Sequence, residues 1–194
     1  IRAYDVTGVQ TCALPIFSAE TVHETAEGML EQGRLLARIH ENVVIKVPLT
    51  EEGIKATKVF SDEGIRTNVT LCFQSAQAIV AAKAGAAFVS PFVGRIDDIS
   101  GDCIVLIEEI VEIYANYPAL QTQVLAASIR HPLHLVQAAQ AGADVATVPY
   151  EVLKKLFNHP LTDSGNEKFT RDWESVPDPD IVGQVTRWLE RNGR

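Results

Sequence analysis

Lys46 lies inside an apolar run, V-V-I-K-V-P-L-T at residues 43–50, and is the residue best placed to do chemistry. A short run rich in β-branched residues predicts a strand buried on both faces, and Pro48 ends it because proline has no N–H for a central ladder. Side chains alternate along a strand, so Lys46 shares a face with Val44. An unpaired buried charge is costly. Lys46 is therefore expected either at the solvent-exposed end of the strand or in a site that keeps its amine partly neutral for chemistry.

Other polar residues recur where strands are expected to end. The predicted strands are 17–20, 42–47, 67–71, 86–90, 123–128 and 143–148. The polar residues at or just beyond their ends are Glu20, Lys46, Asn68, Thr70, Ser90, Ser128 and Arg130, and Arg95 falls in the loop after a strand. Barrel enzymes build their sites at the C-terminal ends of parallel strands, so these residues are the candidate site.

A lysine among Glu, Asn, Thr and Ser suggests a Schiff base. The amine must be neutral to attack a ketone, so its pKa must fall from ~10.4 toward neutrality, which burial and nearby cations promote. The iminium is then an electron sink, and the neighbouring C–C bond breaks without a metal. Glu20 is a candidate to position or activate the water that leaves and returns. The alternative for Glu20 is a solvated carboxylate that caps a helix expected at 21–39.

Arg95, Ser128 and Arg130 form a candidate anion site. The sequence S-I-R places the serine and the arginine two residues apart, hence on one face if the strand continues. Barrel enzymes often bind phosphate in the loops after their last strands. The alternative for Arg95 is a local salt bridge to Asp97 or Asp98.

His131 and His134 form an H-x-x-H pattern at an expected helix start. Two histidines without a third ligand or a carboxylate at helical spacing are weak evidence for a metal. We interpret them as surface or capping residues and predict no metal site.

The elements that must position these residues alternate regularly. Helices are expected at 21–39, 50–62, 73–85, 102–116 and 132–141, with three more helical segments at 149–157, 163–174 and 178–192. Alternating strands and helices predict a parallel sheet with right-handed crossovers, either a (β/α)8 barrel or an open doubly wound sheet. No glycine fingerprint follows a strand. Together with the polar strand ends, this favours an α/β fold of the TIM-type (β/α)8 barrel class.

The composition and charge of the chain argue against several classes of binding partner. The net charge of -8 argues against a general nucleic-acid or anionic-membrane surface. Cys12, Cys72 and Cys103 are widely spaced without C-x-x-C, which argues against a disulfide framework or a zinc site and suits a reducing cytoplasm. No apolar run approaches the roughly 20 residues of a membrane span, and the N-terminus lacks the pattern of a signal peptide.

Residues 1–16 fit poorly with the rest of the chain, because they show no clear helical or strand period. The run G-V-Q-T-C-A-L-P-I resembles a translated sequencing-adapter read-through. We interpret 1–16 as a non-native or disordered leader, the alternative being a genuine short strand and loop. Residues 17–176 then form the barrel units, and 177–194 form a C-terminal helix.

Several motifs together resemble the small transaldolases, the subfamily that also contains fructose-6-phosphate aldolase. They are V-V-I-K-V-P-L-T, G-I-R-T-N-V-T-L, A-G-A-A-F-V-S-P-F-V-G-R-I-D-D, L-A-A-S-I-R-H-P and H-P-L-T-D-S-G. The resemblance runs from about residue 18 to residue 173, with the motifs at the expected strand ends.

This resemblance implies that Lys46 forms the Schiff base with a ketose phosphate, that Glu20 positions water, and that Thr70 lies beside it. The substrate-binding residues that it implies are Asn68, Ser90, Phe92 and a phosphate clamp of Arg95, Ser128 and Arg130. Family members that act as transaldolases carry Phe at position 92, whereas the aldolase group carries Tyr, so Phe92 favours a transaldolase.

The implied reaction is the reversible transfer of a dihydroxyacetone unit. It converts sedoheptulose 7-phosphate and glyceraldehyde 3-phosphate into erythrose 4-phosphate and fructose 6-phosphate. It belongs to the pentose phosphate pathway and needs no metal or organic cofactor. The small family members are typically pentamers stacked into decamers. The segment 178–192 could reach a neighbouring subunit, as the family's C-terminal helix does.

The chain departs from the family in strand number. Six strands are expected from Phe17 on where a barrel needs eight, so the first two βα units are missing or replaced. The family carries a catalytic aspartate on its first strand and a threonine-asparagine pair on its second, and Asp5 could imitate that aspartate by position. The alternatives to a transaldolase are an aldolase that releases dihydroxyacetone and an inactive barrel fragment.

Overall fold

A computed structural model describes residues 2–4, 16–177 and 179–193. The chain forms two compact units, Ile1–Lys155 and Leu156–Arg194. Asp5 and Cys12, which the sequence singles out, lie outside the described residues.

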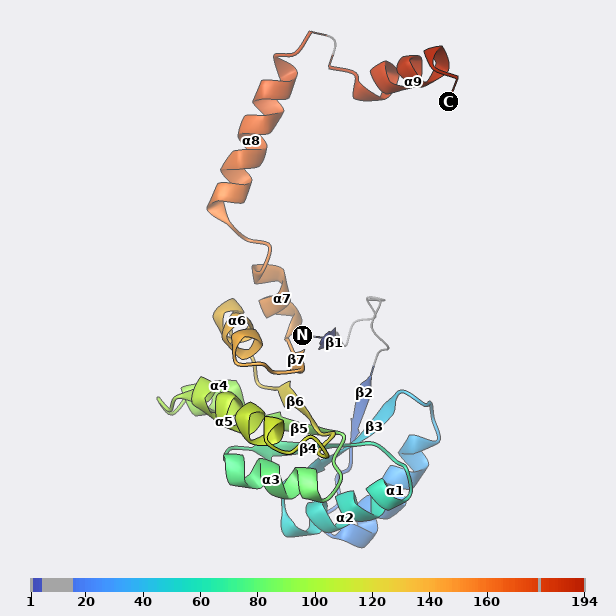
Figure 1. Cartoon of the computed structure of the whole chain (residues 1–194), viewed down its shortest axis with the longest axis vertical. Coiled ribbons are helices and arrows are strands. Elements are labelled where there is room, and N and C mark those ends of the chain that lie inside the picture. The colour runs from blue at the N-terminus through green and yellow to red at the C-terminus, as the bar shows by residue number, and fades with distance from the viewer. Residues whose placement is uncertain (1, 5–15, 178, 194) are drawn as a thin grey trace. The chain divides into compact units, whose positions relative to one another are not determined.

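The first unit is built on a seven-stranded sheet with the order β1-β7-β6-β5-β4-β3-β2 (Figure 1). Every pair of neighbouring strands is parallel. The strands are β1 (Arg2–Tyr4), β2 (Phe17–Glu20), β3 (Val43–Pro48), β4 (Thr67–Cys72), β5 (Phe88–Pro91), β6 (Gln123–Ala126) and β7 (Val145–Thr147). Among the described residues β1 and β2 end the sheet, which is therefore an incomplete (β/α) barrel and confirms the predicted fold class.

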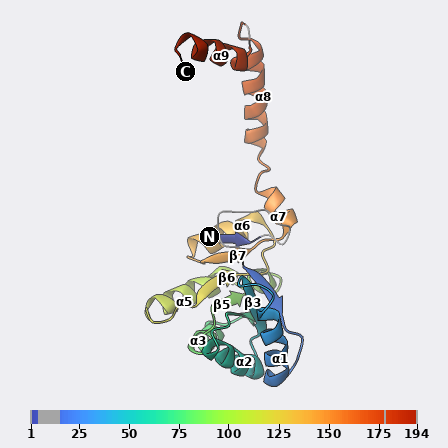
Figure 2. The ribbon, with the colours of Figure 1, turned by 90° about the vertical axis from the view of Figure 1, so that its right-hand side faces the viewer.

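The helices of the first unit follow the strands in the order expected, with one unpredicted addition, the short helix α4. They are α1 (Ala26–Ala37), α2 (Glu51–Asp62), α3 (Ser75–Lys83), α4 (Val93–Asp97), α5 (Cys103–Ala115), α6 (Pro132–Gln140) and α7 (Tyr150–Lys155). Helices α1, α2, α3 and α5 pack against the sheet, and α1 lies beside α2 in both views (Figures 1 and 2).

The two faces of the sheet bury different residues, as the alternation of strand side chains requires. Val43, Ile45 and Val47 of β3 join the large core beneath the helices. Val44 joins a smaller cluster with Phe88, Leu125, Ala127 and Val145. Lys46 shares the face of Val44, as predicted, so the candidate lysine projects from the face that carries the smaller cluster.

Turns and caps explain most of the helix boundaries. Thr50 is the N-cap of α2 and accepts a hydrogen bond from the Gly53 N–H, as its sequence position predicts. Gly85 and Gly142 follow α3 and α6 with φ of +89° each, a conformation that favours glycine after a helix.

The first helix begins five residues later than predicted. The helix expected from residue 21 begins at Ala26, because Thr25 is its N-cap, and Val22 lies exposed before it. The Thr21 N–H instead donates to the Lys46 carbonyl oxygen, which extends the pairing of β2 with β3.

Strand β1 comes from the segment that shows no strand period in the sequence. Arg2, Ala3 and Tyr4 pair in parallel with Val145, Ala146 and Thr147 of β7. The pairing partner is more than a hundred residues away along the chain, so local sequence carries no sign of it.

The second unit contains α8 (Pro160–Glu174) and α9 (Ile181–Arg191). Neither helix has a buried residue among those the structure describes. Their exposed apolar side chains include Leu161, Phe169, Trp173, Ile181, Val182, Val185 and Leu189. None of the described helices combines the length and the hydropathy that spanning a bilayer requires.

Candidate active site

Lys46 and Glu20 form an ion pair at the C-terminal ends of β3 and β2. Their strands are parallel, with Glu20 directly opposite Lys46. The Lys46 Nζ donates to Glu20 Oε2 at 2.9 Å, and the two side chains are 26% and 49% exposed. Glu20 therefore contacts the lysine and does not cap a helix, which excludes the alternative considered for it.

Asn68 lies on the other side of Lys46, in register with it on β4. The buried Asn68 amide accepts from Ser90 Oγ at 2.6 Å and donates to Ser18 Oγ at 3.2 Å. These two bonds orient the amide. Both Asn68 and Ser90 are thus held in fixed positions next to the lysine.

The hydroxyl of Thr70 is buried and has no hydrogen-bond partner among the described residues. A buried hydroxyl without a partner is costly, so such groups usually meet a water or a ligand. Thr70 lines the same cavity as Lys46. Thr70 is therefore a residue of the cavity wall whose hydroxyl is satisfied by no protein group that the structure describes.

A tight approach of α4 to the segment after β6 builds the other side of the site. Phe92 pairs with Ala127, and the Val93 N–H donates to the Ala127 carbonyl at 3.0 Å. A Cβ atom at Gly94 would overlap the carbonyl oxygen of Ser128. Glycine at position 94 thus lets α4 lie directly against this segment.

Arg95 and Arg130 come from these two elements, and both are exposed. The Arg130 Nη2 donates to Asp98 Oδ2 at 2.9 Å. The Arg95 guanidinium lies 4.8 Å from the centre of the Phe92 ring, within the range of a cation–π contact. Among the described residues no ion pair joins Arg95 to Asp97 or Asp98, so the salt bridge considered for it is not formed.

Arg95 was predicted in a loop, but it lies on the short helix α4. Ser128 lies just beyond β6 rather than in a continued strand, with φ of +61°. A non-glycine residue in this left-handed region is strained, which is common at ligand sites.

A cavity of about 300 Å³ joins the two sides. Eight of the nine predicted site residues line it: Lys46, Asn68, Thr70, Ser90, Phe92, Arg95, Ser128 and Arg130. The ninth, Glu20, contacts Lys46. Thr147, Leu125 and Ala127 also line the cavity and were not predicted. Thr147 is a polar residue at the end of β7, so the rule that found the others would have found it.

The two histidines differ in burial. His131 is the N-cap of α6 and accepts from the His134 N–H at 3.3 Å, so its predicted capping role is confirmed. His134 is buried, and the prediction of a surface position for it was wrong. It packs against Asp97 of α4 and Cys103 of α5, which the sequence places about 30 residues or more away.

Comparison with known proteins identifies the family of the chain. Residues 10–182 match the family model described as Transaldolase/Fructose-6-phosphate aldolase. Proteins described as "Probable transaldolase" from Caldicellulosiruptor saccharolyticus and Myxococcus xanthus are 61% and 60% identical to the chain, over 82% and 91% of its length. The matches cover 74% and 80% of those two relatives. The chain therefore belongs to the transaldolase/fructose-6-phosphate aldolase family.

Proposed function

We propose that the protein is a transaldolase that transfers a dihydroxyacetone unit between sugar phosphates through a Schiff base on Lys46. The observation that carries this proposal is the Lys46–Glu20 pair beside a cavity that also presents Asn68, Ser90 and two arginines. An amine in the cavity wall, a carboxylate in contact with that amine and arginines that can bind an anion are the parts that Schiff-base chemistry on a ketose phosphate requires.

The reaction begins when Lys46 Nζ, having lost its proton, attacks C2 of fructose 6-phosphate. The carbinolamine loses its hydroxyl as water and leaves an iminium. Glu20, within hydrogen-bonding distance of Nζ, is placed to take the amine proton and to return it to the departing hydroxyl.

The iminium accepts the electron pair of the C3–C4 bond, while the C4 hydroxyl loses its proton to a base. Glyceraldehyde 3-phosphate leaves, and a three-carbon enamine remains on Lys46. The enamine C3 attacks the aldehyde carbon of erythrose 4-phosphate, whose oxygen takes up the proton. Water then hydrolyses the new iminium and releases sedoheptulose 7-phosphate.

The remaining residues bind and orient the substrate. Arg95, Ser128 and Arg130 hold the phosphate of donor and acceptor, since guanidinium groups match phosphate oxygens in geometry and charge. Asn68 and Ser90 contact the hydroxyls of the bound three-carbon unit, and Thr70 holds water near Glu20. The iminium is itself the electron sink, so the proposed reaction needs no metal or organic cofactor.

Phe92 supports transfer over release of free dihydroxyacetone. It lines the cavity and packs edge-on against Phe73, with ring centres 5.6 Å apart. Release requires that the enamine carbon be protonated, and phenylalanine has no proton to give. A tyrosine, as in the aldolase group, would bring a hydroxyl into this wall of the cavity.

A donor–acceptor assay tests the proposal. Fructose 6-phosphate is supplied with and without erythrose 4-phosphate, and glyceraldehyde 3-phosphate and free dihydroxyacetone are measured. We expect glyceraldehyde 3-phosphate to accumulate only when the acceptor is present. Dihydroxyacetone formed without acceptor would identify an aldolase, and no product from folded protein would identify an inactive barrel fragment.

We also infer that α9 forms an interface between copies of this chain. Ile181, Val182, Val185 and Leu189 are exposed and fall within one stripe of the helix. Val185→Glu should reduce the molar mass measured by light scattering, while Arg191→Glu, outside the stripe, should not. An equal mass for both variants and the parent would contradict this interface.

A further inference from the structure

Behind the phosphate clamp lies a second row of polar residues that does not line the cavity. Asp97 and Asp98 are neighbours at the end of α4. Asp98 pairs with the Arg130 side chain at 2.9 Å, and Asp97 pairs with His134 of α6 at 3.5 Å. The two aspartates thus tie α4 to Arg130 and to the helix that follows it, α6.

His134 is held at both ring nitrogens. Its side chain is 3% exposed, and its Nδ1 accepts a hydrogen bond from the Arg130 backbone N–H at 3.3 Å. Its Nε2 faces the Asp97 carboxylate. The ring also lies against the His131 ring, with centres 3.7 Å apart. The imidazole therefore fixes the backbone of Arg130 from behind.

These contacts determine where the imidazole proton lies. A nitrogen that accepts a hydrogen bond carries no proton, so the neutral ring has its proton on Nε2, the nitrogen that faces the Asp97 carboxylate. A second proton on Nδ1 would face the Arg130 N–H and break that bond. The neutral ring is thus the form that holds the segment.

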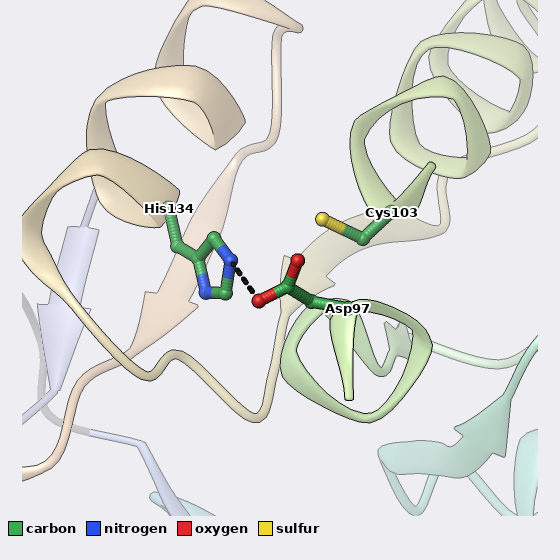
Figure 3. Close-up of side chains that lie close together, drawn as sticks. All are labelled: Asp97, Cys103 and His134. Carbon is green, nitrogen blue, oxygen red and sulfur yellow. Dashed lines mark ion pairs between the residues drawn. The ribbon is translucent and has the colours of Figure 1, made fainter. Parts of the chain in front are cut away.

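Cys103 stands beside this pair, and Figure 3 shows its sulfur and the two other side chains pointing toward one another. The ligand atoms of Asp97, Cys103 and His134 lie within 4.8 Å of one another. A cation here would take the Nε2 lone pair, and the ring proton would move to Nδ1. The bond to Arg130 would then be lost, so cation binding and support of Arg130 exclude each other.

The segment that His134 supports is one that needs support. Ser128 has φ of +61°, and a strained conformation persists only where the surroundings hold it. Arg130 itself is exposed and anchored through one side-chain ion pair and this backbone bond. Without the imidazole, this segment would lose one of the few contacts that hold Arg130 in place.

We propose that His134, with Asp97 behind it, is a positioning residue that holds the backbone of Ser128–Arg130 in the geometry that binds the substrate phosphate. It touches neither substrate nor reacting atoms. The proposal rests on the proposed function only in the identity of the anion, and inorganic phosphate is therefore the probe.

Calorimetric binding of inorganic phosphate to the full chain tests it. His134→Leu removes both ring nitrogens, and we expect the dissociation constant to rise about tenfold, which corresponds to about 1.4 kcal/mol. His134→Asn keeps an acceptor near the position of Nδ1 and should restore most of the affinity. Asp97→Ala, at an exposed position, should weaken binding about threefold and serves if His134→Leu does not fold.

A kinetic split tests the same role where turnover is present. KM for fructose 6-phosphate should rise in His134→Leu more than kcat falls. Borohydride trapping of dihydroxyacetone, which has no phosphate, should proceed as in the parent chain. Equal loss with both ligands would show general damage to the fold and would overturn the proposal.

These experiments distinguish failure of the positioning role of His134 from failure of the proposed transaldolase function. Parent protein that binds phosphate but forms no Schiff base would contradict the transaldolase and leave the positioning role standing. Equal phosphate affinity in the parent, His134→Leu and Asp97→Ala would overturn the positioning role, as would no phosphate binding by the parent. Cadmium bound through both Cys103 and His134 Nε2, with unchanged phosphate affinity, would also overturn it, because the ring proton would then lie on Nδ1 and the bond to Arg130 would be lost.

Discussion

The two sides of the candidate site are built by different means. Lys46, Glu20 and Asn68 stand on neighbouring strands in direct register, so backbone pairing fixes their separation. Arg95 and Arg130 stand on a five-residue helix and a loop, which meet through one short backbone contact and are otherwise held by side-chain contacts behind the arginines. Changes on the strand side should therefore alter the bond-making steps, whereas changes on the loop side should alter phosphate affinity.

Glu20→Gln should have the largest effect among the variants that leave the lysine in place. It keeps the size of the side chain but removes the proton acceptor beside Lys46, so kcat should fall about a hundredfold or more. KM should change little, because the residues proposed to bind the phosphate are unchanged. Steady-state kinetics with Glu31→Gln, an exposed position on α1, provides the control. A change mainly in KM would contradict the division between the two sides.

Gly94→Ala should disrupt the packing of α4 against Ser128 on the loop side of the site. The added Cβ would overlap a backbone carbonyl, which cannot rotate away, so α4 must shift from Ser128. We expect the free energy of unfolding to fall by about 1–3 kcal/mol, the usual cost of overpacking, together with a marked loss of phosphate affinity. Urea denaturation and calorimetry measure the two.

Gly165→Ala is the matched control for that substitution. Gly165 lies in α8 with open space where its Cβ would be. Alanine favours a helix over glycine, so the free energy of unfolding should not fall. Equal destabilisation by both substitutions would show that the close approach at Gly94 is not the cause.

The pH dependence of the free energy of unfolding tests how His134 stabilises the loop side. Burial, and then the nearby His131, lower the pKa of the His134 imidazole, while Asp97 opposes them. The other charged or titratable groups that face the ring are Arg130 and the Cys103 thiol. Because the folded-state pKa lies below the unfolded value of about 6.5, the unfolded chain binds the proton first.

The contribution of His134 to the free energy of unfolding is therefore complete above about pH 6.5 and is lost as the pH falls through the folded-state pKa. The difference in unfolding free energy between the parent chain and His134→Asn should shrink between about pH 7.5 and about pH 5. Urea denaturation across this range measures it. A difference that grows on acidification would mean that the ring is held in its charged form.

Asp98→Asn should have the smallest effect. Its ion pair with Arg130 joins two side chains that are 50% and 54% exposed, and exposed pairs contribute little. We expect phosphate affinity to change by no more than about threefold. A loss as large as that of His134→Leu would show that the side-chain pair, rather than the backbone bond, holds Arg130.

The sequence predicts the cavity residues of both sides, but it predicts the backbone of the strand side well and that of the loop side poorly, for physical reasons. Alternation along a strand places Lys46 with Val44, and the polar ends of β2 to β5 follow from the same period. No such period exists for Arg95, whose helix is one turn long, or for His134, which is buried by side chains from α4 and α5. Strand β1 likewise depends on a distant partner.

Borohydride trapping tests the proposed Schiff base most directly. The chain is incubated with fructose 6-phosphate, reduced with borohydride, digested and analysed by mass spectrometry, with Lys46→Met as the control. We expect a three-carbon or six-carbon adduct on the peptide that contains Lys46, and none in the control. Folded protein without an adduct, or with the adduct on another lysine in both samples, would contradict a Schiff base at Lys46.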